Sequence, residues 1–96
     1  MKFHHVGITV KSIKQSVAWY TTQFNCKTEY MDDSWAMLLF PEGGYLALVT
    51  DTQHPPHFCL ETPNAESYGE LKEHRDGTKT TYITDPDGNV VELLDT

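Results

Sequence analysis

The apolar residues of this chain follow strand-like and helix-like patterns whose order nearly repeats. From Phe3 to Val10, apolar side chains alternate with polar or small ones, which is typical of a β-strand with one buried face. A helix is expected next, because Ser12 and Gln15 fit a capping box. Asn25 is expected to end it. Apolar residues recur between these points at helical spacing: Ile13, Val17, Tyr20 and Phe24.

The remainder of the first half reads as three short strands. They are expected over residues 26–31, 34–40 and 45–50, where β-branched, aromatic and aliphatic residues gather. Asp32-Asp33 separates the first two, and Pro41-Glu42-Gly43-Gly44 separates the second from the third. The first half therefore predicts the order β-α-β-β-β.

The second half resumes the same order with fewer residues. After a polar linker at 51–56, a strand is expected from His57 to Glu61 and a short polar helix from Asn64 to Arg75. Two strands follow, at 78–84 and 89–94. The spacing between matching positions shrinks by about seven residues, roughly one strand with its turn. We therefore expect the second module to be shortened to about β-α-β-β.

Composition and charge narrow the class of protein. With 96 residues and 39% hydrophobic content, the chain suits one globular domain over 1–96: module one at 1–50, the linker at 51–56 and module two at 57–96. The net charge of −7, without a basic run, argues against binding nucleic acid. No apolar run is long enough to cross a membrane, and no targeting segment is recognised, so a cytoplasmic protein with reduced cysteines is expected.

The repeat brings out three candidate metal ligands. His5 and His57 open the two halves, and Glu92 stands in the last expected strand. Each lies on the strand face opposite its apolar neighbours, which are Val6 and Ile8, Phe58 and Leu60, and Val91 and Leu93. Taken singly, each has an ordinary alternative as a surface residue. At matched places in a repeat, two imidazoles and one carboxylate favour a divalent metal site with open coordination positions.

The chain resembles the vicinal oxygen chelate superfamily. The resemblance rests on His5-Val6-Gly7-Ile8, on Ser16-Val17-Ala18-Trp19-Tyr20, and above all on the closing motif Asp85-Pro86-Asp87-Gly88-Asn89-Val90-Val91-Glu92-Leu93. This superfamily includes glyoxalase I, methylmalonyl-CoA epimerase, extradiol dioxygenases, fosfomycin-resistance thiol transferases and bleomycin-binding proteins. The resemblance implies an α+β fold in which paired βαβββ modules, the second shortened, form an open, curled mixed sheet with a cleft.

The resemblance also implies a chemistry. A divalent metal ion (Fe, Mn, Ni, Co or Zn) would be held in the cleft by His5, His57 and Glu92, and Glu92 would also take part in catalysis. The fourth ligand position of many members falls on Ala47, which has no ligand atom. A metal-dependent enzyme acting on a small oxygenated molecule is expected, as a lyase, isomerase, dioxygenase or thiol transferase. The alternatives are a non-catalytic binder of a small molecule or antibiotic, as in bleomycin resistance, and a purely structural dimerisation module.

Other residues are given ordinary roles. His54 and His74 have no repeat partner and are expected at the surface, and Cys59 is expected to be a small core residue. The scattered Lys and Arg residues offer no anchor for coenzyme A. A second copy of the chain is expected to cover the shortened edge of module two, giving a homodimer. The apolar face of the strand at 34–40 is expected to line a pocket or to lie in the core or a dimer interface: Trp35, Met37 and Leu39.

Overall fold

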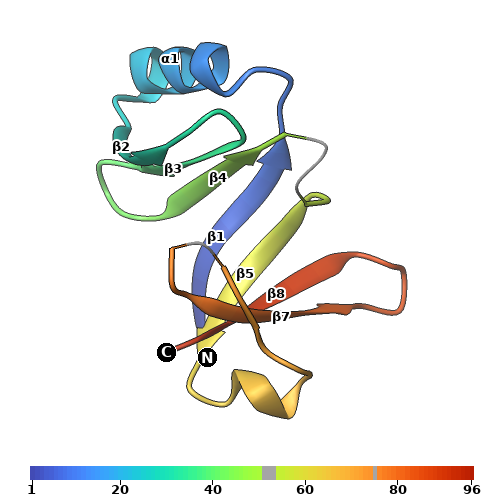
Figure 1. The fold of residues 1–96 in the computed structure, drawn as a ribbon. Coiled ribbons are helices and arrows are strands. Elements are labelled where there is room, and N and C mark those ends of the chain that lie inside the picture. Colours follow the sequence, from blue (N-terminus) through green and yellow to red (C-terminus); the bar gives the residue numbers. More distant parts are fainter. Residues whose placement is uncertain (51–53, 75) are drawn as a thin grey trace. The chain divides into compact units, whose positions relative to one another are not determined.

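A computed structural model describes residues 1–50, 54–74 and 76–96, and the chain forms two compact units (Figure 1). The first unit is His5–Pro56, and the second unit combines Met1–His4 with His57–Thr96. Strand β1 (Lys2–Thr9) begins in the second unit and ends in the first. Residues 51–53 of the expected linker lie outside the described ranges. Among those ranges, no helix has the length and apolar character needed to cross a bilayer.

The first unit follows the order predicted from its sequence pattern. After β1 come α1 (Ile13–Phe24), β2 (Lys27–Met31), β3 (Trp35–Leu39) and β4 (Tyr45–Val49). The strand order is β2-β3-β4-β1, with β1 parallel to β4 and the other neighbours antiparallel. The predicted β-α-β-β-β order of this half is therefore confirmed.

Local side-chain chemistry sets both ends of α1. Ser12 is the N-cap, and its Oγ accepts a hydrogen bond from the Gln15 backbone N–H at 3.2 Å. This bond satisfies one of the amide groups that the first helical turn leaves without a partner. Asn25 ends the helix in the left-handed region, with φ of 57°, which asparagine tolerates better than most residues. Both predicted ends of the helix are confirmed.

The core of the first unit lies between α1 and one face of its strands. Ile13 and Val17 of α1 pack against Ala36, Leu38 and Leu48, which are all fully buried. Because side chains alternate along a strand, the other face of β3 carries side chains that are only half-buried: Trp35, Met37 and Leu39. Burial of each leucine contributes about 1.5–3 kcal/mol relative to leaving it exposed.

The second unit contains β5 (His57–Thr62), a short 3₁₀ helix η1 (Ala65–Ser67), β6 (Lys72–Glu73), β7 (Lys79–Thr84) and β8 (Val90–Asp95). Its strand order is β1-β5-β8-β7-β6, in which β8 is parallel to β5 and antiparallel to β7, and β7 is antiparallel to β6. The described residues thus hold eight strands in parallel and antiparallel pairs with one α-helix, which confirms the predicted α+β class.

The predicted loss of a strand from module two is wrong. The shortening falls instead on the helix, because the 12 residues of α1 are matched by only three in η1, and β6 keeps two residues. The expected helix from Asn64 to Arg75 does not form, and Arg75 itself lies outside the described residues. This segment lacks an apolar stripe to bury: Ala65 is buried, whereas Tyr68 is exposed.

Candidate functional site

Glu92 lies at the centre of the second unit's strands. It sits on β8, directly opposite Cys59 on β5 and Tyr82 on β7. Only 6% of its surface is exposed. A buried carboxylate is costly unless it is paired and hydrogen-bonded, so its neighbours decide what it can do.

The two carboxylate oxygens of Glu92 have different neighbours. His57 Nε2 lies 3.1 Å from Oε1. On the other side, His74 Nε2 lies 3.4 Å from Oε2, and the Tyr82 hydroxyl donates a hydrogen bond to the same oxygen at 3.2 Å. Oε1 therefore faces His57, while Oε2 is held between an imidazole and a phenol.

The charge of Glu92 acts on the groups around it. The pKa of His74 is raised, chiefly by its hydrogen bond to Glu92. Burial, and then the negative charge of Glu92, raise the pKa of the Tyr82 hydroxyl and that of the Cys59 thiol. Tyr82 and Cys59 thus keep their protons at neutral pH, so that Tyr82 serves as a hydrogen-bond donor.

The spacing of His57 and Glu92 suits two ligands of one metal ion. His57 is buried on β5, opposite Val90 and two residues before Cys59. Metal–nitrogen and metal–oxygen bonds of about 2.1 Å place two ligand atoms about 3.0 Å apart at a right angle and about 3.4 Å apart at the tetrahedral angle of zinc sites. The observed 3.1 Å between Nε2 and Oε1 lies between these two values. Imidazole and carboxylate are ligands that Zn, Fe, Mn, Ni and Co all accept.

His5, the third predicted ligand, is buried in β1 and belongs to the first unit. It lies opposite Tyr45 of β4, and two residues further along Gly7 lies opposite Ala47. Ala47 is 3% exposed, so the position that corresponds to a fourth ligand is a buried methyl group. The first unit supplies no carboxylate there.

His74 was missed by sequence reasoning. It was expected at the surface, yet its side chain is only 28% exposed and contacts Glu92. The chain turns directly after β6, and the His74 backbone N–H donates to the Thr78 carbonyl at 2.7 Å. Its Nε2 also lies 2.7 Å from Oγ1 of Thr80, which is fully buried. The signal was Asp76-Gly77, a turn followed by the strand-like segment 78–84, but the polar residues before the turn were assigned to a helix.

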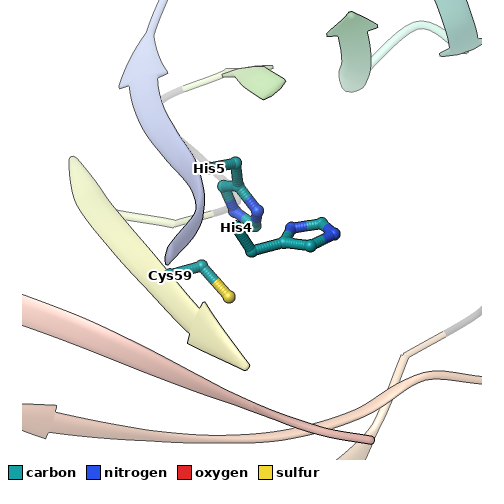
Figure 2. Close-up of side chains that lie close together, drawn as sticks. All are labelled: His4, His5 and Cys59. Carbon is teal, nitrogen blue, oxygen red and sulfur yellow. The ribbon is translucent and has the colours of Figure 1, made fainter. Parts of the chain in front are cut away.

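Cys59 is fully buried, as expected, and both cysteines are free thiols. Figure 2 shows the side chains of His4, on β1, and Cys59, on β5, both within the second unit. The thiol sulfur and a ring nitrogen of His4 lie within 4.8 Å of each other. His54, expected at the surface, is half-buried in the first unit.

Comparisons with known proteins identify the fold. No protein-family model matches the chain, and no curated protein sequence matches it. Among solved structures, methylmalonyl-CoA epimerase of Streptomyces coelicolor is similar over 100% of this chain and 97% of its own, with a TM-score of 0.77 and 18% identity. The Mycobacterium tuberculosis epimerase is similar over 98% and 87%, with a TM-score of 0.71 and 17% identity.

A third similar structure carries a different name. It is described as an NAD-dependent benzaldehyde dehydrogenase of Legionella pneumophila, and it covers 94% of this chain and 96% of its own, with a TM-score of 0.70 and 16% identity. At such low identities the comparisons establish the fold alone. One fold hosts many reactions, so the reaction must be inferred from the residues of the site.

Proposed function

We propose that this chain, which has the fold of the vicinal oxygen chelate superfamily, is a metal-dependent enzyme acting on a small oxygenated molecule. His5, His57 and Glu92 would hold one divalent cation (Fe, Mn, Ni, Co or Zn). The observation that carries the proposal is the 3.1 Å spacing of His57 Nε2 and Glu92 Oε1 inside a buried site. His5 supports the proposal because it is a third buried residue, and its imidazole offers a nitrogen ligand atom as His57 does.

The ligand set defines the chemistry that is available. A cation held by two imidazoles and a carboxylate would keep open positions, and there it would supply Lewis-acid activation of a bound oxygen. Glu92 would hold the cation through a carboxylate oxygen and is the proposed catalytic carboxylate. The protonated Tyr82 hydroxyl donates to that carboxylate, and burial keeps bulk water away from it. These groups suit proton or group transfer on a small molecule with paired oxygen atoms.

The reaction stays open among lyase, isomerase, dioxygenase and thiol transferase. The titles of the Streptomyces epimerase structures name complexes with 2-nitronate-propionyl-CoA, an acyl-CoA ligand. The few basic residues of this chain are scattered along it, which argues against an anchor for coenzyme A phosphates. We therefore favour a smaller substrate. A homodimer and a cytoplasmic location are further predictions.

Ala47 favours a second candidate function. A buried methyl group stands where many relatives are expected to place a fourth ligand, which suits a scaffold that binds a small molecule or antibiotic without turnover. This binder would need no metal. The two candidates therefore differ in a quantity that is simple to measure.

Metal content decides between them. The protein is purified without a histidine tag, and its bound Fe, Mn, Ni, Co and Zn are measured by mass spectrometry. About one equivalent per chain, lost in His57→Ala and kept in the control His54→Ala, supports the enzyme. Metal-free protein that also shows no affinity on titration contradicts it and favours the binder.

The substrate class needs a separate screen. Metal-loaded protein is heated with small acids, diols, thiol conjugates and antibiotics, because a ligand that binds only the folded state raises the unfolding temperature. A diol or hydroxy acid that stabilises the metal-loaded form, but not the metal-free form, supports metal-dependent chemistry. Stabilisation of both forms by an antibiotic supports the binder.

A further inference from the structure

We propose that Tyr82 and His74 are positioning residues that hold Oε2 of Glu92 and so direct Oε1 towards the metal beside His57. This inference rests on the proposed metal site and adds how its carboxylate is oriented. Neither residue belongs to the predicted ligand set, and neither needs to touch the cation. Their proposed role is to fix how many coordination positions Glu92 occupies.

The evidence is the unequal environment of the two oxygens. Oε2 lies 3.2 Å from the Tyr82 hydroxyl, which donates to it, and 3.4 Å from His74 Nε2. Oε1 lies 3.1 Å from His57 Nε2, close enough for one ion to be bound by both atoms. Hydrogen bonding at Oε2 in this way favours metal binding through Oε1.

The anchors are themselves held in place. Tyr82 lies directly opposite Glu92 on the adjacent strand β7, so strand pairing places the two side chains next to each other. His74 comes from the turn after β6, and Thr80 Oγ1 lies 2.7 Å from its Nε2. Because Thr80 is fully buried on β7, its hydroxyl holds the imidazole of His74 in position beside the carboxylate. Partners behind a metal ligand act in this manner elsewhere.

The orientation has a chemical consequence in a site with few ligands. Without anchors, the Glu92 side chain can rotate and bind a cation through both oxygens. Two-point binding would occupy one of the positions that a substrate's paired oxygens need. Anchoring Oε2 therefore keeps that position open.

The test measures cobalt binding by absorbance, because the visible spectrum of Co²⁺ reports both affinity and coordination. Tyr82→Phe removes a single oxygen and keeps the ring, and His74→Ala removes the second anchor. Each is expected to weaken Co²⁺ binding by about 10–100-fold and to shift the spectrum towards higher coordination. His74→Gln, which restores an N–H near the position of Nε2, is expected to recover part of the affinity and the original spectrum.

The control is Tyr20→Phe, which removes a hydroxyl from α1 in the first unit and is expected to change neither quantity. Thermal unfolding of every variant identifies any loss of fold. If Tyr82→Phe and His74→Ala are folded and bind Co²⁺ with the affinity and spectrum of the original protein, the positioning role is wrong while the metal site stands. If the original protein binds no Co²⁺, the proposed function fails and the positioning role fails with it.

Discussion

The two units pair their strands alike but differ in the residues at the centre. In the first unit, β4 lies parallel to β1 and antiparallel to β3, and Ala47 faces Gly7 and Met37 across these pairs. In the second, β8 lies parallel to β5 and antiparallel to β7. Its central row carries an acid, a thiol and a phenol: Glu92, Cys59 and Tyr82. The same strand pairing thus supports an apolar row of residues in one unit and a row of ionisable residues in the other.

This difference separates the residues that make the fold from those that make the site. Leu48 and Leu93 follow Ala47 and Glu92 by one position, point to the opposite face and are both almost fully buried. They keep their apolar character in both units, because each closes the core beneath its sheet. The residues on the other face of each sheet can differ in type between the two units. One unit can therefore carry ionisable groups where the other carries apolar ones.

The largest effect is expected from exchanging the central residues. Glu92→Gln should weaken metal binding by more than about 100-fold, since partners behind a ligand alone account for about 10–100-fold. Ala47→Glu should destabilise the metal-free protein by about 3–5 kcal/mol, because it buries a charge whose direct cross-strand partners, Gly7 and Met37, carry no basic group. Metal titration and chemical denaturation measure the two effects.

The contrast would fail if Ala47→Glu were as stable as the original protein. Ala47→Gln serves as the matched control, because glutamine has the volume of glutamate without its charge. A smaller loss for glutamine than for glutamate would attribute the difference to charge burial rather than to added volume.

The next effect compares the two cores. Leu48→Ala and Leu93→Ala remove the same atoms from matching positions, and each should cost about 2–5 kcal/mol. Leu48 packs beneath the 12-residue α1, whereas η1 covers β8 in the second unit. A three-residue turn can move into a cavity more easily than a helix, so Leu48→Ala should be the more costly. Equal losses in urea unfolding would show that η1 is as rigid a cover as α1.

A smaller effect is expected at Gly69, where the chain crosses β7 after η1. A Cβ built there would lie 2.6 Å from Thr81 Oγ1, which is closer than nonbonded atoms approach. Gly69→Ala should therefore cost about 1–3 kcal/mol through overpacking. In the Thr81→Ala background the same change should cost much less, because the opposing hydroxyl is absent. A double-mutant cycle by thermal unfolding tests this, and full additivity of the two changes would disprove the contact.

The smallest effect concerns matching turns. Asp32 accepts hydrogen bonds from the Ser34 backbone and hydroxyl, and Asp76 accepts the same pair from Thr78. Asp32 also accepts a bond from the Tyr30 hydroxyl at 2.6 Å, the largest cause of its lowered pKa. For Asp76, burial raises the pKa, but the bonds from Thr78 outweigh it and the net shift is also downward.

Both folded carboxylates thus titrate below their unfolded values. Their stabilising contribution is fully present above the unfolded pKa, near pH 4, and is lost as the pH falls through the folded pKa. Asp32 should release its contribution at the lower pH of the two. Carboxyl carbon chemical shifts between pH 1 and 5 follow each residue. Tyr30→Phe should raise the midpoint of Asp32 and leave that of Asp76 unchanged; a common midpoint before the substitution would contradict the comparison.

The first unit was readable from sequence because its signals are local. Ser12 and Gln15 mark the start of α1, and Asn25 marks its end, within one helical turn of the residues they cap. The apolar stripe between them needs no information from elsewhere in the chain. The turns between the strands are also marked by the residues that form them. The order of the strands and the helix could therefore be predicted from the sequence.

The second unit was harder, because its local signals disagree with its packing. The segment after Thr62 is polar and lacks an apolar stripe, and the sequence pattern was interpreted there as a helix. The actual turn depends on Gly69 approaching Thr81, a contact between residues that are distant along the chain. His74 was lost for the same reason, since only the β6–β7 hairpin brings it to Glu92. The proximity of His57 and Glu92 could be predicted, because the repeat relates positions that are distant along the chain.

The sharing of β1 bears on how the polypeptide can be divided. Met1–His4 completes the unit that otherwise consists of His57–Thr96, and the Phe3 ring stacks on Phe58 with centroids 6.1 Å apart. A gene fragment encoding the C-terminal half alone would leave β5 without this neighbour. Such a fragment should become ordered only when a peptide carrying the first residues is added in trans, so the halves are interdependent parts rather than portable modules.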